Sequence, residues 1–370
     1  MGILRISGNR FQRLPVGLRS GYETVNMAVD LIWEESRKQD LGIDLKLFND
    51  DLSIVFDLFK ERRENILLKR EHSIPSFLGY NTSAPYGNIG IIENKGFDGT
   101  IEYNKRINKD WVIALRGNVT FNKDKWIQGE LPEQKYEWMN QYGHNINGVK
   151  GYVAEGLFTQ TEIDDMARWE SLSDANKAIT PKPFASQFGT VKAGDIKYKD
   201  LNNDGQIDTN DRIILSHTLP RMNYAINLGF GYKNFEIQIV GTGAAFFQTP
   251  MTNSYFWNGW GDGNYSAFVR DNIGGDYPRL AYTKSSNNFV QSDFWLRDGG
   301  WFKIQDVELA YTLPFKQNNK VGIRNIRFSL KGQNLATISK IKDVDPESID
   351  AGVTGYPLFR IITAGIKFNF

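Results

Sequence analysis

The feature that most constrains this fold is a strict alternation of apolar and polar residues, which recurs in many separate segments. Alternation with a period of two is the repeat of a β-strand that has one apolar face. In "WFKIQDVELAYTL" (301–313), the apolar parity switches midway. The clean alternating segments are 41–47, 111–121, 224–232, 235–239, 326–330 and 362–370. The pattern predicts an all-β chain.

The connections between these segments alternate in length. "NDD" (49–51), "NKD" (108–110) and "KN" (233–234) predict tight turns, whereas 123–220 and 246–298 are long irregular stretches. Short turns on one side and long loops on the other are typical of outer-membrane barrels, as are aromatic residues near strand ends. The aromatic residues in such positions are Trp111, Tyr232, Phe235, Trp301, Tyr311, Phe368 and Phe370.

Two architectures fit this pattern, and they differ in where the apolar faces lie. In an antiparallel transmembrane β-barrel, the apolar face contacts lipid and the polar face lines the lumen. In a β-sandwich, two apolar faces are buried against each other. The connection lengths favour the barrel with long extracellular loops. The alternative is a calcium-dependent extracellular β-sandwich that acts as a binding or adhesion module.

Composition excludes several classes of function. Lys plus Arg number 44 against 43 Asp plus Glu, so a net charge of +1 gives no reason to expect nucleic acid as a partner. The chain has no cysteine, which excludes disulfides, thiolate metal sites and cysteine nucleophiles. Its three histidines lie far apart in the sequence, so a histidine-based triad has little basis.

One helix is expected within the first long loop. The segment "TQTEIDDMARWESL" (159–172) has helical spacing of apolar residues, with Thr161 as the expected N-cap. Glu162, Asp164 and Asp165 are close in sequence, but they are most simply the solvated acids of the first turn. Because no nucleophile or acid–base constellation emerges, we expect that the chain is not an enzyme.

"KDLNNDGQIDTND" (199–211) is dense in short carboxylates and amides around Gly205. It fits a calcium-loop template, which wraps hard oxygen ligands round one point. The candidate ligands, at template positions 1, 3, 5, 7, 9 and 12, are Asp200, Asn202, Asp204, Gln206 through its carbonyl, Asp208 and Asp211. The alternative is a turn with solvated carboxylates. The sequence predicts a structural calcium site, because an ion would offset the entropy of ordering a long loop.

An aromatic stretch, "SYFWNGWGDGNYSAF" (254–268), is a second candidate site. Aromatic rings with nearby amides can stack on sugars or contact a peptide. The candidate ligand-binding residues are Tyr255, Phe256, Trp257, Trp260 and Tyr265. The favoured alternative is that these rings only pack the loop against its neighbours or a partner.

Several motifs resemble SusC/RagA-type TonB-dependent outer-membrane transporters. They are "GDIKYKDLNNDGQIDTNDRIIL", the following "PRMNYAINLGFGYKNFEIQI", "NIGIIENKGFDGTIEYNKRI" and the ending "AGIKFNF". The resemblance implies a large β-barrel with a plug in the outer membrane of a Gram-negative, Bacteroidetes-like bacterium, in contact with outer-membrane lipid. It also implies TonB-dependent import of glycans, peptides or similar large nutrients, and a SusD-type surface lipoprotein as partner.

The resemblance is to the C-terminal part of that barrel, over residues 1–370. Neither a signal peptide nor a plug domain is recognisable, so we expect contact with the TonB complex only through a missing N-terminal region. We therefore expect an open, curved sheet that is incomplete for import on its own. Its edges are expected near residues 19–33 and at 358–370, with Phe370 facing lipid.

Overall fold

The computed structural model describes most of the chain. The described residues are 31–72, 84–252, 256–257, 267–271, 273–274, 277–280, 285–315, 323–342, 344–347 and 358–370. The edge strand expected near residues 19–33 therefore lies almost entirely outside the described residues. Residues 31–34 are not in a strand, and the first described strand begins at Glu35.

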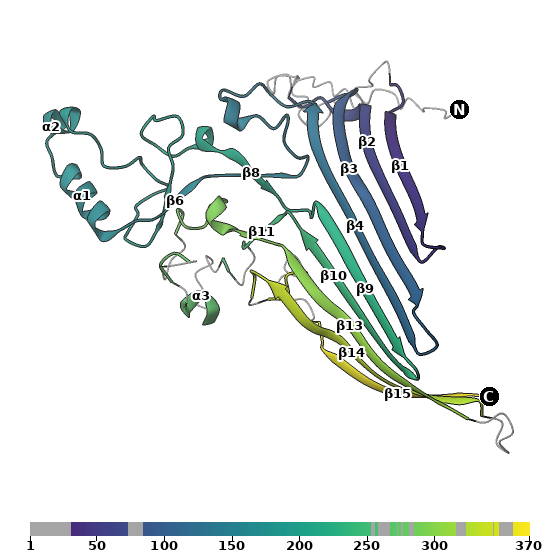
Figure 1. Ribbon diagram of the computed structural model, residues 1–370. Helices are drawn as coiled ribbons and strands as arrows, with labels where there is room; N and C mark the ends of the chain where they lie inside the picture. Colours follow the sequence, from purple (N-terminus) through teal and green to yellow (C-terminus); the bar gives the residue numbers. More distant parts are fainter. Residues whose placement is uncertain are drawn as a thin grey trace, which may run out of the picture.

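A nine-stranded antiparallel sheet forms the body of the molecule (Figure 1), in the order β1-β2-β3-β4-β9-β10-β13-β14-β15. Its strands are β1 (Glu35–Leu47), β2 (Leu52–Lys69), β3 (Tyr86–Arg106), β4 (Trp111–Gln128), β9 (Met222–Tyr232), β10 (Phe235–Ala245), β13 (Trp301–Pro314), β14 (Asn325–Ser339) and β15 (Ile361–Asn369). Among the described residues the sheet is open, with β1 and β15 at its edges. The last edge strand lies where the sequence predicts it.

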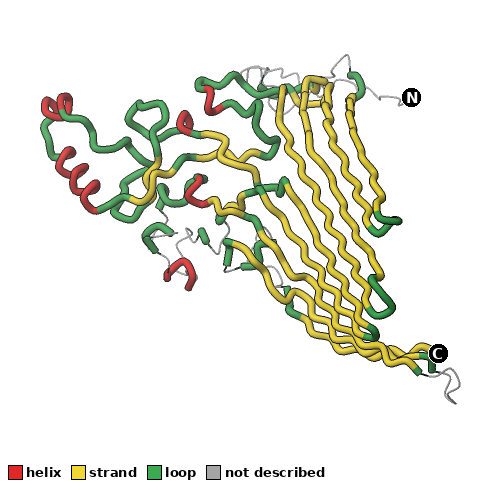
Figure 2. The backbone as a smooth tube through the Cα atoms, viewed as in Figure 1, coloured by secondary structure: helices red, strands yellow, loops and turns green. Residues whose placement is uncertain are grey.

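The short turns lie together at one end of the sheet, and the long connections lie at the other (Figure 2). The β1–β2 turn holds Phe48, Asn49 and Asp50 at φ of 55°, 59° and 69°. In the β3–β4 turn, the Asn108 side chain accepts hydrogen bonds from the backbone N–H of Asp110 (2.8 Å) and Trp111 (3.0 Å). Asparagine and aspartate favour such turns because they tolerate left-handed backbone and bond to nearby N–H groups. The tight turns expected from sequence are confirmed.

A β-bulge explains the parity switch in residues 301–313. The register of β13 with both neighbouring strands shifts between Ile304 and Asp306. The extra residue of a bulge moves the following side chains to the other face, which restores a common face across the sheet. Ile304 and Val307 consequently lie on the same face, opposite Gly241 and Ile239 of β10.

One face of the sheet is apolar across six strands from β4 to β15. Its rows can be followed in the strand register. The row nearest the short turns is Trp111, Tyr232, Phe235, Tyr311, Phe328 and Ile366. The next two rows are Ile113, Phe230, Ile237, Leu309, Leu330 and Ala364, then Leu115, Leu228, Ile239, Val307, Gly332 and Ile362. In the first row, ring centroids of Trp111 and Tyr232 are 4.5 Å apart, as expected for an aromatic girdle.

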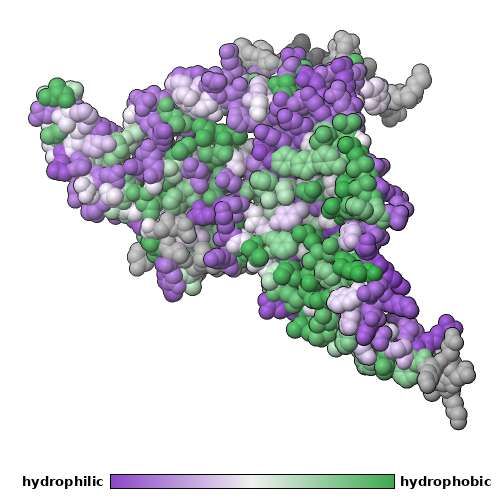
Figure 3. Space-filling model, viewed as in Figure 1, coloured by the Kyte–Doolittle hydropathy of each residue, from purple (hydrophilic) through white to green (hydrophobic). Residues whose placement is uncertain are grey.

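These apolar side chains are exposed rather than packed against a second layer. Leu309 and Leu330 are each 49% exposed and Ile366 is 61% exposed. Hydrophobic residues form a band along the sheet between hydrophilic regions at both ends (Figure 3). A β-sandwich would bury this face, so the exposed band fits the membrane barrel and not the sandwich alternative.

The opposite face is polar and carries cross-strand ion pairs. Arg116 of β4 pairs with Glu102 of β3 at 3.0 Å, and Lys331 of β14 pairs with Asp306 of β13 at 3.0 Å. Charged and small polar residues are what a lumen-facing surface requires.

The remaining elements are short and lie in the long connections. They are β5 (Gly148–Gly151), β6 (Ala154–Leu157), α1 (Gln160–Glu170), α2 (Asp174–Ile179), β7 (Ile196–Tyr198), β8 (Ile213–His217), β11 (Gln248–Pro250), α3 (Ala267–Asp271) and β12 (Leu296–Asp298), with single 3-10 turns at Glu137–Met139, Thr209–Asp211 and Asp293–Trp295. None of the helices in the described parts of the chain has the length and apolar character needed to cross a membrane.

The first residue of α1 corrects one expectation. The N-cap is Thr159, not Thr161, because Thr159 and Glu162 form a reciprocal capping box. The Thr159 side chain accepts from the Glu162 N–H at 3.3 Å, and Glu162 accepts from the Thr159 N–H at 2.8 Å. The residue three positions after Thr161 is Asp164. An aspartate side chain is shorter than that of glutamate and does not suit the return bond of a capping box.

Candidate functional site

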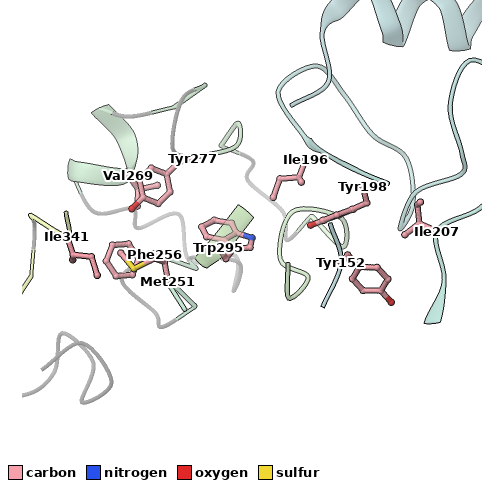
Figure 4. Close-up of a cluster of buried hydrophobic side chains, with 10 residues drawn as sticks. All are labelled: Tyr152, Ile196, Tyr198, Ile207, Met251, Phe256, Val269, Tyr277, Trp295 and Ile341. Atoms are coloured by element: carbon pink, nitrogen blue, oxygen red, sulfur yellow. The ribbon is translucent and has the colours of Figure 1, made fainter. Parts of the chain in front are cut away.

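The two long connections, β4–β9 and β10–β13, lie beyond one end of the sheet (Figure 1). They pack on each other and form a buried core (Figure 4). Four of its residues come from the first connection, five from the second, and the last follows β14. They are Tyr152, Ile196, Tyr198, Ile207, Met251, Phe256, Val269, Tyr277, Trp295 and Ile341. The hydrophobic core thus orders the loops, while the sheet leaves its apolar face exposed.

Trp295 lies near the middle of this loop core and is 1% exposed. Its ring centroid is 5.8 Å from that of Trp257 and 6.1 Å from that of Tyr277. Its indole N–H donates to the Asn288 carbonyl at 2.9 Å. A buried tryptophan whose N–H is satisfied fixes the position of the segments around it.

A buried polar node joins the same two loops. Asp195 is fully buried, and its Oδ1 accepts a hydrogen bond from the Asn288 side chain at 2.7 Å. The Arg279 guanidinium donates to Asp195 Oδ2 at 3.1 Å, which compensates the buried charge. Asn288 Oδ1 in turn accepts from the Ile196 N–H at 2.9 Å. Burial also raises the pKa of the nearby Tyr198 phenol, so this tyrosine stays neutral.

The calcium-type stretch is a compact loop beside this core. Asp200 Oδ2 accepts from the Gly205 N–H at 2.8 Å, and Asn202 Oδ1 accepts from the Asp204 N–H at 3.0 Å. Asp204 Oδ1 accepts from the Gln206 N–H at 3.0 Å. Gly205 has φ of 86°, the conformation that the template requires of its sixth position.

Asp211, at template position 12, closes the loop. It is fully buried. Its Oδ1 accepts from the Leu201 N–H at 2.8 Å, and its Oδ2 accepts from the Asp208 N–H at 2.9 Å. The loop is also tied to other segments: Ile207 N–H donates to the Ser186 carbonyl at 2.8 Å. The stretch therefore ties two segments of the first long connection together.

Whether these oxygens suit a cation depends on which of them are free. Asp200 Oδ1 is buried and has no hydrogen-bond partner. A buried carboxylate oxygen is normally paired with a hydrogen-bond donor or with a cation. In contrast, both oxygens of Asp211 bind backbone N–H groups. No three His, Asp or Glu side chains among the described residues come together as a ready metal-binding group. The donor types are those that calcium prefers, and Asp200 Oδ1 is a buried oxygen to which no protein group donates.

The aromatic stretch is only partly described. Phe256 is buried, with its ring 6.3 Å from that of Tyr277. Trp257 packs edge-on against Trp295 in the loop core. Both rings therefore contribute to packing within the loops. Tyr255, Trp260 and Tyr265 lie outside the described residues, and their role in ligand binding stays a prediction.

A polar cleft that the sequence analysis did not identify opens between β2–β4 and the first long connection. Its volume is about 400 Å³, and its walls include Arg63, Asn94, Asn122 and Arg221. Asn94 Oδ1 and Arg221 Nε are buried there without hydrogen-bond partners. The amide, carboxylate and guanidinium side chains that line the cleft suit a polar ligand. The alternating polar residues of β3 and β4 could have predicted the polar wall of this cleft. They could not have predicted which loop covers it.

His217 borders the same cleft. Its Nε2 lies 2.5 Å from the Phe246 carbonyl. Burial lowers the pKa of the imidazole, so His217 is neutral at pH 7 and donates this hydrogen bond. It acts as a positioning contact between the two long connections rather than as a charge.

The acidic residues of α1 have ordinary structural partners. Glu162 pairs with Lys197 at 2.9 Å, and its pKa is lowered chiefly by the hydrogen bond from the Thr159 N–H. Asp164 accepts from the Gln160 side chain at 2.8 Å, and Asp165 pairs with Arg168. These contacts account for the three acids without catalysis.

Comparisons with known proteins agree with this architecture. TonB-dependent receptor P3 of Formosa agariphila is 26% identical over 92% of this chain and 34% of the receptor. TonB-dependent receptor SusC of Bacteroides thetaiotaomicron is 21% identical over 92% of this chain and 32% of the receptor. A structure of the RagAB peptide importer in its 'open-open' state superposes with a TM-score of 0.68 at 19% identity, covering 99% of this chain and 38% of that one. No family model matches the chain.

These similarities confirm the resemblance to TonB-dependent receptors of the SusC/RagA type and the fold class, an antiparallel portion of a large outer-membrane barrel. The relatives are receptors rather than enzymes, which confirms that expectation, and the outer-membrane location is confirmed with them. The chain spans about a third of the length of the curated relatives it matches.

Proposed function

We propose that this chain, which is similar to TonB-dependent receptors along almost its whole length, forms part of the wall of an outer-membrane nutrient importer. The observation that carries the proposal is the exposed apolar band between the aromatic row and the long loops. Leu309 and Leu330 within this band are each 49% exposed. Exposing apolar side chains to water costs free energy, which only a lipid or an apolar partner offsets. The polar face then lines the path of the nutrient.

The nutrient is proposed to be a glycan, a peptide or another large polar molecule. The polar cleft supports this class, because amide, carboxylate and guanidinium side chains line it and can pair with the amide or hydroxyl groups of such a molecule. The long loops are proposed to contact a SusD-type surface lipoprotein. Energy from the TonB complex is proposed to reach the importer through regions that the relatives possess outside the matched third.

An uptake assay tests this function. The gene containing this chain is deleted, and growth on single glycan or peptide fractions is compared with growth of the parent strain. We expect loss of growth on one class of nutrient, and the same loss in a strain without TonB. Restoration by the intact gene is the positive control. Unchanged uptake of all fractions in the deletion strain would contradict the proposal.

We further propose that the loop 200–211 binds calcium as a structural ion. Asp200, Asn202 and Asp204 would supply side-chain oxygens, and Gln206 its carbonyl. Asp208 and Asp211 would complete the set, Asp211 after exchange of its backbone hydrogen bonds. The ion would clip the first long connection together. The free Asp200 Oδ1 is the support for this assignment.

Calcium is expected to stabilise the loops of the wild-type chain by about 2–3 kcal/mol at a hundredfold excess over its dissociation constant. Asp200→Ala is expected to abolish the effect, because it removes the oxygen without a protein partner. Asp174→Ala, which removes an exposed acid at the start of α2, is the matched control. Calorimetric titration and thermal unfolding with and without chelator measure both. Absence of binding heat in the wild type would leave only a hydrogen-bonded turn.

A further inference from the structure

A row of lysines crosses three neighbouring strands at the loop end of the apolar face. Lys60 of β2 is directly opposite Lys95 of β3, and Lys95 is directly opposite Lys123 of β4. Side chains alternate along each strand, so these lysines share the face of Leu58, Phe97 and Phe121. All three lysines are exposed. Like charges in directly opposite positions are destabilising, so the row implies an anionic partner.

The protein itself neutralises this row only in part. Glu93 pairs with Lys60 at 3.3 Å, but it also pairs with Lys125 at 3.0 Å. No ion pair within the described part of the chain involves Lys95 or Lys123. One carboxylate, Asp40, borders the same region on the β1 side. The centre of the row therefore keeps an excess of positive charge.

An apolar groove begins beside the lysine row, on the side of the short turns. Its volume is about 470 Å³, and Leu41, Leu58, Phe97 and Phe121 line it, with the lysine row at its edge. The rings of Phe97 and Phe121 stack with centroids 5.6 Å apart, so the groove has a broad aromatic wall. It continues the apolar band toward the long loops.

We propose that Lys60, Lys95 and Lys123 bind the phosphate-bearing headgroup of an anionic lipid whose acyl chain lies in this groove. The inference rests on the membrane placement of the apolar face and goes beyond nutrient import. An ammonium group binds phosphate well, and long lysine side chains reach a headgroup while their stems cover apolar surface. A single molecule with a charged head and an apolar tail satisfies both halves of the site. The long loops place it in the outer leaflet.

The test measures lipid binding by the full chain purified in uncharged detergent, with native mass spectrometry as readout. Phosphatidic acid is the probe, phosphatidylcholine the zwitterionic comparison and inorganic phosphate the competitor. We expect the double variant K95Q/K123Q to bind phosphatidic acid at least tenfold more weakly than the wild type. K105Q/K109Q, which removes two lysines at the opposite end of β3, is expected to bind like the wild type.

Other outcomes decide against the proposal. Equal binding of phosphatidylcholine, or equal loss in K105Q/K109Q, would show general detergent-like adhesion. If inorganic phosphate displaces phosphatidic acid and binds with the same affinity, the lysines form a simple anion site. If K95Q/K123Q does not assemble, K95R/K123R is compared with the wild type instead. This variant must keep the wild-type affinity for phosphatidic acid. Added salt must weaken lipid binding both in this variant and in the wild type. Affinity that does not change with salt would overturn the charge-based assignment.

Discussion

Ile239→Arg is expected to lower sharply the amount of this chain that assembles in the outer membrane. Ile239 lies in the third apolar row, directly opposite Leu228 and Val307. An arginine on the lipid face near the middle of a bilayer costs about 2–4 kcal/mol. That cost is a large share of the stability of an ordinary folded domain.

The neighbouring residue provides the matched control. Gln238 lies on the polar face, opposite Gly229 and Glu308. Gln238→Arg introduces the same side chain one position away, where there is room beside a glycine and an acid to pair with. We expect near-normal assembly of Gln238→Arg, measured by outer-membrane fractionation and by urea unfolding in lipid vesicles. Equal losses in both variants would show that the Ile239 face does not contact lipid.

The strands and the short turns were predictable from sequence because local chemistry determines them. The alternation in 224–232 follows from one face meeting lipid and the other water, and Asn108 is a turn residue by its own side-chain hydrogen bonds. The parity switch in 301–313 indicated an irregular strand, and the bulge between Ile304 and Asp306 is its cause. The loop at 200–211 was recognisable for the same reason, since its hydrogen bonds are almost all local.

The loop core was not predictable, because it depends on contacts between segments far apart in the chain. Ile196 and Asn288 are separated by 92 residues, yet they share a buried hydrogen bond. No periodic pattern in either loop announces such a pairing. The same limit explains the polar cleft, which is lined both by Asn94 on a strand and by Arg221 at the end of a loop. The N-cap of α1 was predicted wrongly for a local reason. The hydrogen bond that the Glu162 side chain accepts determines which of two threonines is the N-cap.

This division between sheet and loops leads to the second prediction of large effect. Trp295→Ala is expected to destabilise the packed loops by about 3–5 kcal/mol, because it removes a fully buried indole and leaves a cavity. The opening equilibrium of the loops should then rise by roughly two to four orders of magnitude. The nine-stranded sheet should persist, since its stability comes from strand pairing and its apolar face, not from the loop core.

Two readouts separate the loops from the sheet. Limited proteolysis on intact cells should cleave Trp295→Ala within 129–221 and 246–300, and hydrogen exchange should quicken there but not in β9 or β10. Trp111→Ala is the control: Trp111 is 44% exposed at the aromatic row, so its loss should leave the loops closed. Trp295→Phe should lie between wild type and Trp295→Ala, because a ring still fills part of the space. If the sheet loses protection together with the loops, the two are one cooperative unit, and the loops cannot open over the polar face without unfolding the wall.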